Sequence, residues 1–181
     1  IHSVNDVLKK EFGRSISDEN VHVLDPFTGT GTFITRLLQS GLIDKKDLER
    51  KFKQELHANE IVLLAYYIAA VNIENAFHDQ LEENQEYQSF EGIVLTDTFQ
   101  LDEVKTTQYG TETTFSRNFE RIMSQKNAPL RVIMGNPPYS VGQKSANDNA
   151  QNQAYPKLDA RIAATYAKAT DATNKNSLYD S

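Results

Sequence analysis

Four predicted strands of this chain each end on a carboxylate or amide side chain. The strands span residues 21–25, 52–60, 91–97 and 130–136, and their last residues are Asp25, Glu60, Asp97 and Asn136. Between them, segments 32–41, 61–77 and 114–127 have apolar residues at helical spacing. Strands that alternate with helices indicate parallel βαβ units with right-handed crossovers. The prediction is an α/β fold with an open, doubly wound, Rossmann-like sheet, in which ligands bind at the carboxyl ends of the strands.

The two ends of the chain lie outside this alternating pattern. Residues 1–12 have helical spacing without a preceding cap, and residues 158–170 form a plausible alanine-rich helix. Residues 143–154 are rich in amides and poor in apolar side chains, which predicts a mobile loop. We expect a core at 1–140, a polar loop plus helix at 141–181, and a longer chain of which this is a fragment.

Composition excludes several kinds of function. The chain has 181 residues and no cysteine, so disulfides, thiolate zinc sites and cysteine nucleophiles are excluded. His57 has no second histidine at ligand spacing, so no metal site is expected. A net charge of −6 argues against a self-sufficient nucleic-acid binder. No apolar run reaches the length of a membrane span and no signal peptide is present, so we expect a cytoplasmic protein without a membrane partner.

The segment "DPFTGTGTF" (25–33) predicts a ligand-binding turn between a strand and a helix. Gly29 and Gly31 would allow positive φ and close approach of a ligand to the backbone. The segment lacks the Gly-Lys-Ser/Thr ending of a phosphate loop and the third glycine of a dinucleotide site. Asp25 would repel a pyrophosphate but would suit a positively charged amino group. The alternative is a tight turn without a ligand.

Two further acids stand at corresponding strand ends. Glu60 is placed to accept hydrogen bonds from ribose hydroxyls, and Asp97 to accept one from an exocyclic amine. The structural alternatives are a glutamate favoured by a helix N-terminus and an aspartate that caps a helix or turn. Taken with Asp25, the two acids describe a ligand with an amino acid, a ribose and an aminopurine. S-adenosylmethionine fits this description.

The segment "IMGNPPYS" (133–140) ends the fourth predicted strand on a rigid turn. Pro137 and Pro138 donate no backbone hydrogen bonds and fix φ near −65°. Asn136 and Tyr139 would therefore be held on a stiff backbone, as a clamp for a flat molecule with an amino group requires. The alternative is a Pro-Pro turn followed by a tyrosine of the core.

These segments resemble motifs of a known enzyme family. "DPFTGTGTF", "HANEIVLLAYYIAAVNIE", "GIVLTDTF" and "MGNPPYS" are similar to motifs I to IV of the N6-adenine DNA methyltransferases, in the gamma-type order with the cofactor region first. Glu60, Ala65 and Asn72 fall at the spacing of the second motif. The segment that begins at Asn136 further resembles the methyltransferase part of single-polypeptide type I (type ISP) restriction–modification enzymes. In those enzymes one chain carries nuclease, helicase, methylase and target-recognition domains.

The resemblance implies a class I methyltransferase fold, truncated at both ends, with S-adenosylmethionine as cofactor. It assigns twelve residues to the cofactor site: Asp25, Pro26, Phe27, Thr28, Gly29, Gly31, Thr32, Glu60, Ile61, Asp97, Thr98 and Asn136. It assigns catalysis to Asn136, Pro137, Pro138 and Tyr139. The Asn136 oxygen and the Pro137 carbonyl would accept the two N6 hydrogens of a flipped-out adenine, and Tyr139 would stack on its ring.

The resemblance implies double-stranded DNA as the substrate of a bacterial cytoplasmic enzyme, bound through regions outside this sequence. Residues 1–181 alone are expected not to methylate DNA at a useful rate. Two other interpretations stay open. One is a glutamine-N5 protein methyltransferase of the release-factor type, which also clamps a planar amide with Asn-Pro-Pro-Tyr. The other is a cofactor-binding fragment without catalytic activity.

Overall fold

The computed structural model describes residues 1–81, 86–102, 116–137, 155–169 and 171. Two compact units make up the chain. The first unit contains residues 1–98 and 112–136, and the second contains residues 99–111 and 137–181. The predicted mobile loop at 143–154 lies outside the described residues.

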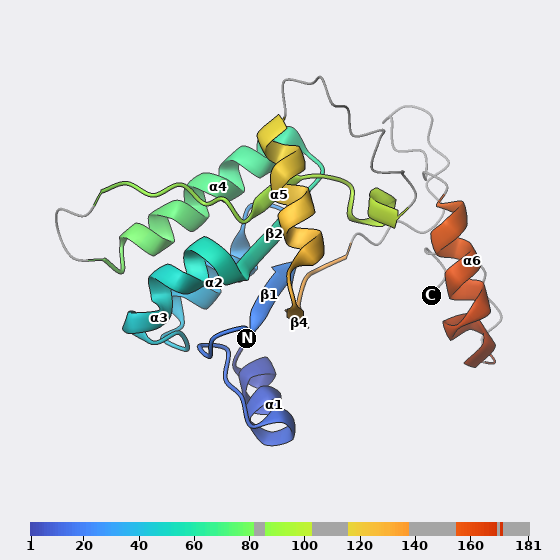
Figure 1. Ribbon diagram of the computed structural model, residues 1–181, viewed down its shortest axis with the longest axis horizontal. Coiled ribbons are helices and arrows are strands. Elements are labelled where there is room, and N and C mark those ends of the chain that lie inside the picture. The colour runs from blue at the N-terminus through green and yellow to red at the C-terminus, as the bar shows by residue number, and fades with distance from the viewer. Residues whose placement is uncertain (82–85, 103–115, 138–154, 170, 172–181) are drawn as a thin grey trace. The chain divides into compact units, whose positions relative to one another are not determined.

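A four-stranded parallel sheet forms the centre of the first unit (Figure 1). Its strands are β1 (His22–Asp25), β2 (Leu56–Glu60), β3 (Ile93–Leu95) and β4 (Leu130–Ile133). Their order in the sheet is β3-β2-β1-β4, so the chain moves outward from β1 to β3 and then returns to place β4 beside β1. The direction of winding therefore reverses between β1 and β4, where ligands bind in sheets of this kind. The predicted α/β, Rossmann-like sheet is confirmed.

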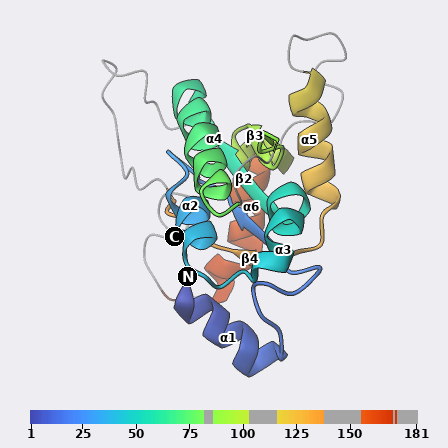
Figure 2. The same ribbon diagram turned by 90° about the vertical axis from the view of Figure 1, so that its left-hand side faces the viewer.

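Helices cover both faces of the sheet (Figure 2). On one face α2 (Thr32–Gln39) packs against α4 (Leu63–His78), and α5 (Ser116–Asn127) lies on the other. The first unit also contains α1 (His2–Phe12) and α3 (Lys45–Arg50). The central core lies where the sheet meets α2 and α4, and its fully buried members include Val23, Ile34, Leu37, Leu56, Ile73 and Phe77.

The prediction of a strand at residues 52–60 was wrong for the first half of that segment. Residues Lys51–Glu55 form a single turn of π-helix, η1, and β2 begins only at Leu56. Phe52 in this turn stacks on Phe77 of α4, with ring centroids 3.8 Å apart. Lys51, which is fully buried, donates hydrogen bonds to the carbonyls of Asp18 and Val21 and pairs with Glu55 at 2.7 Å. These tertiary contacts fix η1 in a helical turn and join it to the segment before β1.

The other elements differ from the predictions mainly at their ends. Strands β3 and β4 are shorter than predicted, and their polar ends lie in the loops that follow. The short helix α3 was not predicted, because Leu48 is its only buried side chain. In the second unit, the helix predicted at 158–170 is instead α6 (Pro156–Ala164) followed by a 3₁₀ turn, η4 (Tyr166–Ala169). In the part of the chain that the structure describes, no helix is long and apolar enough to cross a membrane.

Gly92 is predicted to be essential for pairing between β2 and β3. A Cβ atom at this position would lie 2.1 Å from the carbonyl oxygen of Leu56, and the Gly92 carbonyl accepts a hydrogen bond from the Ala58 N–H. Gly92→Ala is expected to lower the free energy of unfolding by about 3 kcal/mol, because backbone must move to admit the methyl group. Urea denaturation measures this change.

Gly13→Ala is the matched control for this prediction. Gly13 has φ of 61°, and a Cβ atom added there would have no neighbour within 4 Å, so only backbone strain of about 1 kcal/mol is expected. Equal losses for the two variants would show that close packing at Gly92 is unimportant.

Candidate functional site at the carboxyl ends of the strands

The glycine loop after β1 is held in place by α4. Gly29 and Gly31 have φ of 56° and 89°, a conformation that other residues rarely adopt. A Cβ atom on Gly31 would lie 3.2 Å from the Ala69 carbonyl oxygen, so the loop backbone packs directly on α4. Asn72 of α4 also donates a hydrogen bond to the Thr30 carbonyl at 2.9 Å. The loop is thereby fixed at the N-terminus of α2.

Asp25 is a fully buried carboxylate at the end of the central strand. Its Oδ1 accepts a hydrogen bond from the Phe27 N–H at 3.1 Å, whereas Oδ2 has no partner among the described residues. Burial, with a smaller contribution from the charge of Glu60, raises the pKa of Asp25 to about 6. Asp25 Oδ2 is therefore an unused hydrogen-bond acceptor at the carboxyl end of the central strand.

Glu60 joins the glycine loop to the start of α4. Its Oε2 accepts a hydrogen bond from the Gly29 N–H at 2.7 Å, and Oε1 accepts bonds from the N–H groups of Ile61 and Val62 at 2.9 and 2.8 Å. The side chain is buried, while Ile61 beside it is exposed. Glu60 therefore has a structural role in addition to the ligand-binding role predicted from the sequence.

A second hydrogen-bond network connects the end of β2 with the loops after β1 and β3. Thr98 donates to the Pro26 carbonyl at 2.7 Å and accepts a bond from the Asn59 amide at 3.0 Å. The Thr28 N–H donates to the Asn59 carbonyl at 2.9 Å. Within the described residues, Asn59 Oδ1 and Thr96 Oγ1 are buried and have no partner. Both atoms therefore have unused hydrogen-bonding capacity at the carboxyl ends of the strands.

Asn136 follows β4 next to the end of β1. The Met134 N–H donates to the Leu24 carbonyl at 3.0 Å, which continues the pairing of the two strands. A Cβ atom on Gly135 would lie only 2.9 Å from Asp25 Oδ1, so the backbone before Asn136 presses against the carboxylate. Asn136 itself is exposed.

The structure thus brings most of the predicted cofactor residues together at one edge of the sheet. Asp97 and Thr98 follow β3 at the same edge as Asp25 and Glu60. Thr32 is exposed at the N-terminus of α2. Of the predicted catalytic residues other than Asn136, Pro137 is exposed and belongs to the second unit. Pro138 and Tyr139 lie outside the described residues.

Three residues at this edge were missed by sequence reasoning. They are Asn59, Thr96 and Gly135. Each stands immediately before a residue that was predicted, and neighbouring residues in a strand point to opposite faces of the sheet. Attention to the residue before each strand-end acid could have identified Asn59 and Thr96. The contact of Gly135 depends on strand order, which the sequence pattern does not specify.

The charges at this edge favour a cationic ligand. Asp25, Glu60 and Asp97 contribute three acids, and no lysine or arginine occurs between Lys53 and Lys105. A phosphate-rich ligand would be repelled here. Among the residues that the structure describes, no group of three histidines or acids could hold a metal ion.

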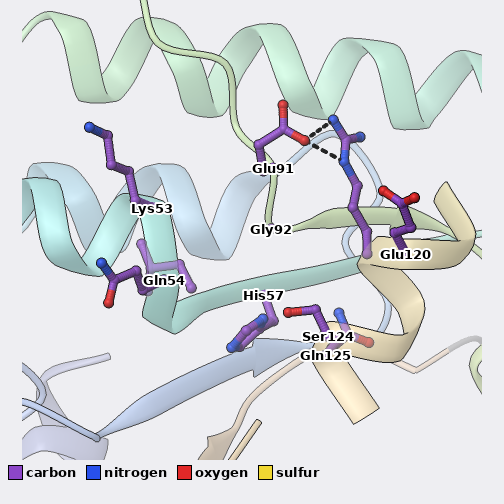
Figure 3. Close-up of a pocket in the computed structure, with 10 residues that line it drawn as sticks. Lys53, Gln54, His57, Glu91, Gly92, Glu120, Ser124 and Gln125 are labelled. Atoms are coloured by element: carbon purple, nitrogen blue, oxygen red, sulfur yellow. Dashed lines mark hydrogen bonds and ion pairs between the residues drawn. The ribbon is translucent and has the colours of Figure 1, made fainter. Parts of the chain in front are cut away.

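A separate cavity of about 370 Å³ lies between η1, β2 and α5 (Figure 3). None of the predicted site residues lines it. Its Glu91 pairs with Arg121 at 2.7 Å, and its His57 shares a hydrogen bond of 2.9 Å with His22. Burial, together with His22, lowers the pKa of His57 to about 4, so the ring is neutral at pH 7. Because its main charges are already paired, this cavity is a weaker candidate than the edge of the sheet.

No protein-family model matches the chain, and no curated protein does. The chain is similar to a segment of an ATP-dependent type ISP restriction–modification enzyme, LlaBIII, bound to DNA, with 50% identity over 98% of this chain and a TM-score of 0.84. It is similar to a nuclease-deletion mutant of the type ISP enzyme LlaGI in complex with a DNA substrate mimic, with 50% identity over 96% and a TM-score of 0.81. A DrdV–DNA complex gives 42% identity over 93% and a TM-score of 0.79. The chain spans 12%, 14% and 16% of these three chains, so in each case its similarity is to one segment of a much longer chain.

Asp25→Asn is predicted to raise the stability of the unliganded protein at neutral pH. The pKa of Asp25 is about 6 in the folded state and ordinarily 3.8, so the folded state holds more protons between these pH values. The free energy of unfolding is therefore highest, as far as Asp25 determines it, below pH 4. It falls as the pH rises from 4 to 6, by about 3 kcal/mol in total.

The measurement is the free energy of unfolding of wild type and variant from pH 4 to 8. The lowered pKa of His57 produces the opposite trend. Burial disfavours the charged form of this ring, so the free energy of unfolding rises as the pH rises above 4. Only the difference between the two proteins isolates Asp25. A difference that does not change with pH would contradict the assignment.

Proposed function

We propose that this chain is the cofactor-binding and clamp-bearing part of a DNA adenine-N6 methyltransferase in a type ISP-like restriction–modification polypeptide. The observation that carries the proposal is the unpartnered Oδ2 of buried Asp25, which lies at the reversal point of the sheet beside the glycine loop. The similarity to segments of type ISP enzymes over nearly the whole chain supports it. So does the resemblance of the strand-end segments to methyltransferase motifs.

The residues at the edge of the sheet fit S-adenosylmethionine. Asp25 Oδ2 would accept a hydrogen bond from the amino group of the methionine part, close to the glycine loop. Glu60 Oε2 accepts one backbone bond and keeps one acceptor site for a ribose hydroxyl, whereas Oε1 already accepts two. Asp97 would accept from the exocyclic amine, and the exposed Ile61 offers an apolar contact for the adenine ring. The acidic surroundings suit the positive charge of this cofactor.

The chain's own contribution to the reaction is to hold an amine in position. The Asn136 side-chain oxygen and the Pro137 carbonyl would accept the two hydrogens of the N6 amine, which directs the nitrogen lone pair toward the cofactor. When bound, the cofactor would supply the methyl group from its positively charged sulfur, which would leave as a neutral thioether. The methylated amine would then be acidic enough to lose one proton to water, so no strong base is required. Catalysis then comes from positioning and from hydrogen bonds to charge that develops in the transition state. Tyr139 would stack on the flipped base.

Double-stranded DNA is the proposed substrate, and residues 1–181 would contribute little to holding it. Three solved structures to which the chain is similar are complexes with DNA or with a DNA substrate mimic. The chain has 19 basic and 25 acidic residues, while affinity for DNA depends mainly on basic contacts to phosphates. Base flipping costs a few kcal/mol, which contacts elsewhere in the longer polypeptide would have to supply.

Loss of the Asp25 charge is predicted to weaken binding of the cofactor. Asp25→Asn should reduce the affinity for S-adenosylmethionine by about 10- to 100-fold, because a charge-assisted hydrogen bond contributes about 1.5–3 kcal/mol. Isothermal titration calorimetry measures the affinity. Asp79→Asn is the control, since Asp79 is exposed at the end of α4 and should have no effect. Equal affinities for all three proteins would remove the observation on which the proposal depends.

Asn136→Ala in the full-length polypeptide is predicted to separate catalysis from cofactor binding. Methyl transfer to duplex DNA should fall by about 10²–10³-fold or more, as expected when a donor or acceptor of the transition state is lost. Cofactor affinity should change less than about 3-fold, and the exposed Asn127→Ala at the end of α5 should leave both unchanged.

Transfer of radiolabelled methyl groups to duplex DNA and to a glutamine-containing protein substrate is the assay. Labelling of the protein alone would favour the glutamine-N5 alternative. Cofactor binding without transfer to either substrate would favour a non-catalytic module.

A further inference from the structure

Helix α4 has a second apolar face on the side opposite its buried one. Its buried face contains Ala69, Ile73, Ala76 and Phe77. On the opposite side Leu64, Tyr67, Ile68 and Val71 are 69%, 57%, 39% and 54% exposed. We refer to these four residues as the outer face of α4. Their spacing of i, i+3, i+4 and i+7 is the spacing at which one helix packs along another.

The composition of α4 is unusual for a helix with one face exposed to solvent. No charged side chain occurs from Ile61 to Ile73, so the first half of α4 is apolar or uncharged all round. A helix of this composition is normally buried on all sides, and a cluster of exposed apolar side chains of this kind marks an interaction site. Figure 2 shows α4 and α2 on one face of the sheet, with the strands to one side of α4.

We propose that the outer face of α4 docks against a helix in another part of the same longer polypeptide. The partner helix would present an apolar face with basic residues beside it. This inference rests on the proposed function only for the existence of that polypeptide. It does not depend on the cofactor or on the reaction.

The lengths of the matched chains support an intramolecular partner. The aligned segment makes up only 12–16% of those chains, so most of each chain lies outside the matched segment. A contact within one chain forms at a high effective concentration, so a patch of two helical turns is sufficient for stable docking. A separate protein would need a larger interface area to bind stably.

The charges next to the outer face indicate the chemistry of the partner. The exposed Asp79 and Glu86 lie beyond its C-terminal end, and no lysine or arginine occurs between Lys53 and Lys105. Nucleic acid and anionic membrane surfaces are both disfavoured by this arrangement. In a symmetric contact, a second copy of this chain would bring the same acidic segment to the interface, where the acids would repel one another. A partner with lysine or arginine beside an apolar ridge complements both features.

Residues 1–181 contain no cysteine, so a cysteine introduced into this segment is the only one in it. Leu64→Cys and Ile68→Cys would be introduced separately into the full-length polypeptide, with Lys46→Cys on α3 as the exposed control. Maleimide labelling of each site is followed by peptide mass spectrometry, and each rate is divided by the rate at the same site in denaturant. We expect labelling at positions 64 and 68 to be at least 10-fold slower, relative to denaturant, than at position 46. The protection should be independent of protein concentration.

Three results would overturn the proposal. They are equal relative rates at all three sites, protection that disappears on dilution, and protection that appears only when DNA or anionic vesicles are added. The second result would indicate a second copy, and the third a nucleic-acid or membrane partner. Calorimetric titration of the same variants with S-adenosylmethionine tests the proposed function separately, because Leu64 and Ile68 are not among the proposed cofactor residues.

Discussion

The packing of Gly135 against the Asp25 carboxylate is the contact on which the arrangement of the site depends. It holds the end of β4 against the end of β1, where the winding of the sheet reverses. Any side chain at position 135 would have to displace Asp25 or Pro26, since a Cβ atom would lie 2.9 and 3.0 Å from them. Asp25 is fully buried at this contact, and its burial raises its pKa to about 6. The absence of a side chain at position 135 thus allows the backbone that leads to Asn136 to lie directly against the carboxylate.

Glu60 shows why folding and ligand binding cannot be fully separated in this site. Its three hydrogen bonds to backbone N–H groups hold the glycine loop and the first turn of α4. A ribose hydroxyl would bind to the same carboxylate. Asp25 is different, because its Oδ2 has no partner among the described residues and its burial lowers stability at neutral pH. Substitution of Glu60 therefore tests structure and binding together, whereas substitution of Asp25 separates them.

The periodicity of apolar residues was sufficient to predict which segments form strands and which form helices. The alternation of strands and helices, and the polar residue at each strand end, indicated the fold class and most of the proposed cofactor site. The prediction failed at residues 52–55, where the buried ion pair of Lys51 with Glu55 and the stacking of Phe52 on Phe77 impose a helical turn. Strand order could not be obtained from periodicity. For that reason the contact of Gly135 with Asp25, and the exposure of one face of α4, became visible only in the structure.

The distribution of charge separates two tasks that a DNA methyltransferase must perform. A cationic cofactor is favoured by acids, while DNA is favoured by lysine and arginine. Residues 54–104 contain the acids Glu60 and Asp97 and no lysine or arginine. In the proposed function this segment is therefore specialised for the cofactor, and the binding energy for DNA must come from other parts of the polypeptide. An outer face of α4 that docks on such a part would fix the cofactor site relative to the bound DNA, because Glu60 and Asn72 connect the same helix to the glycine loop.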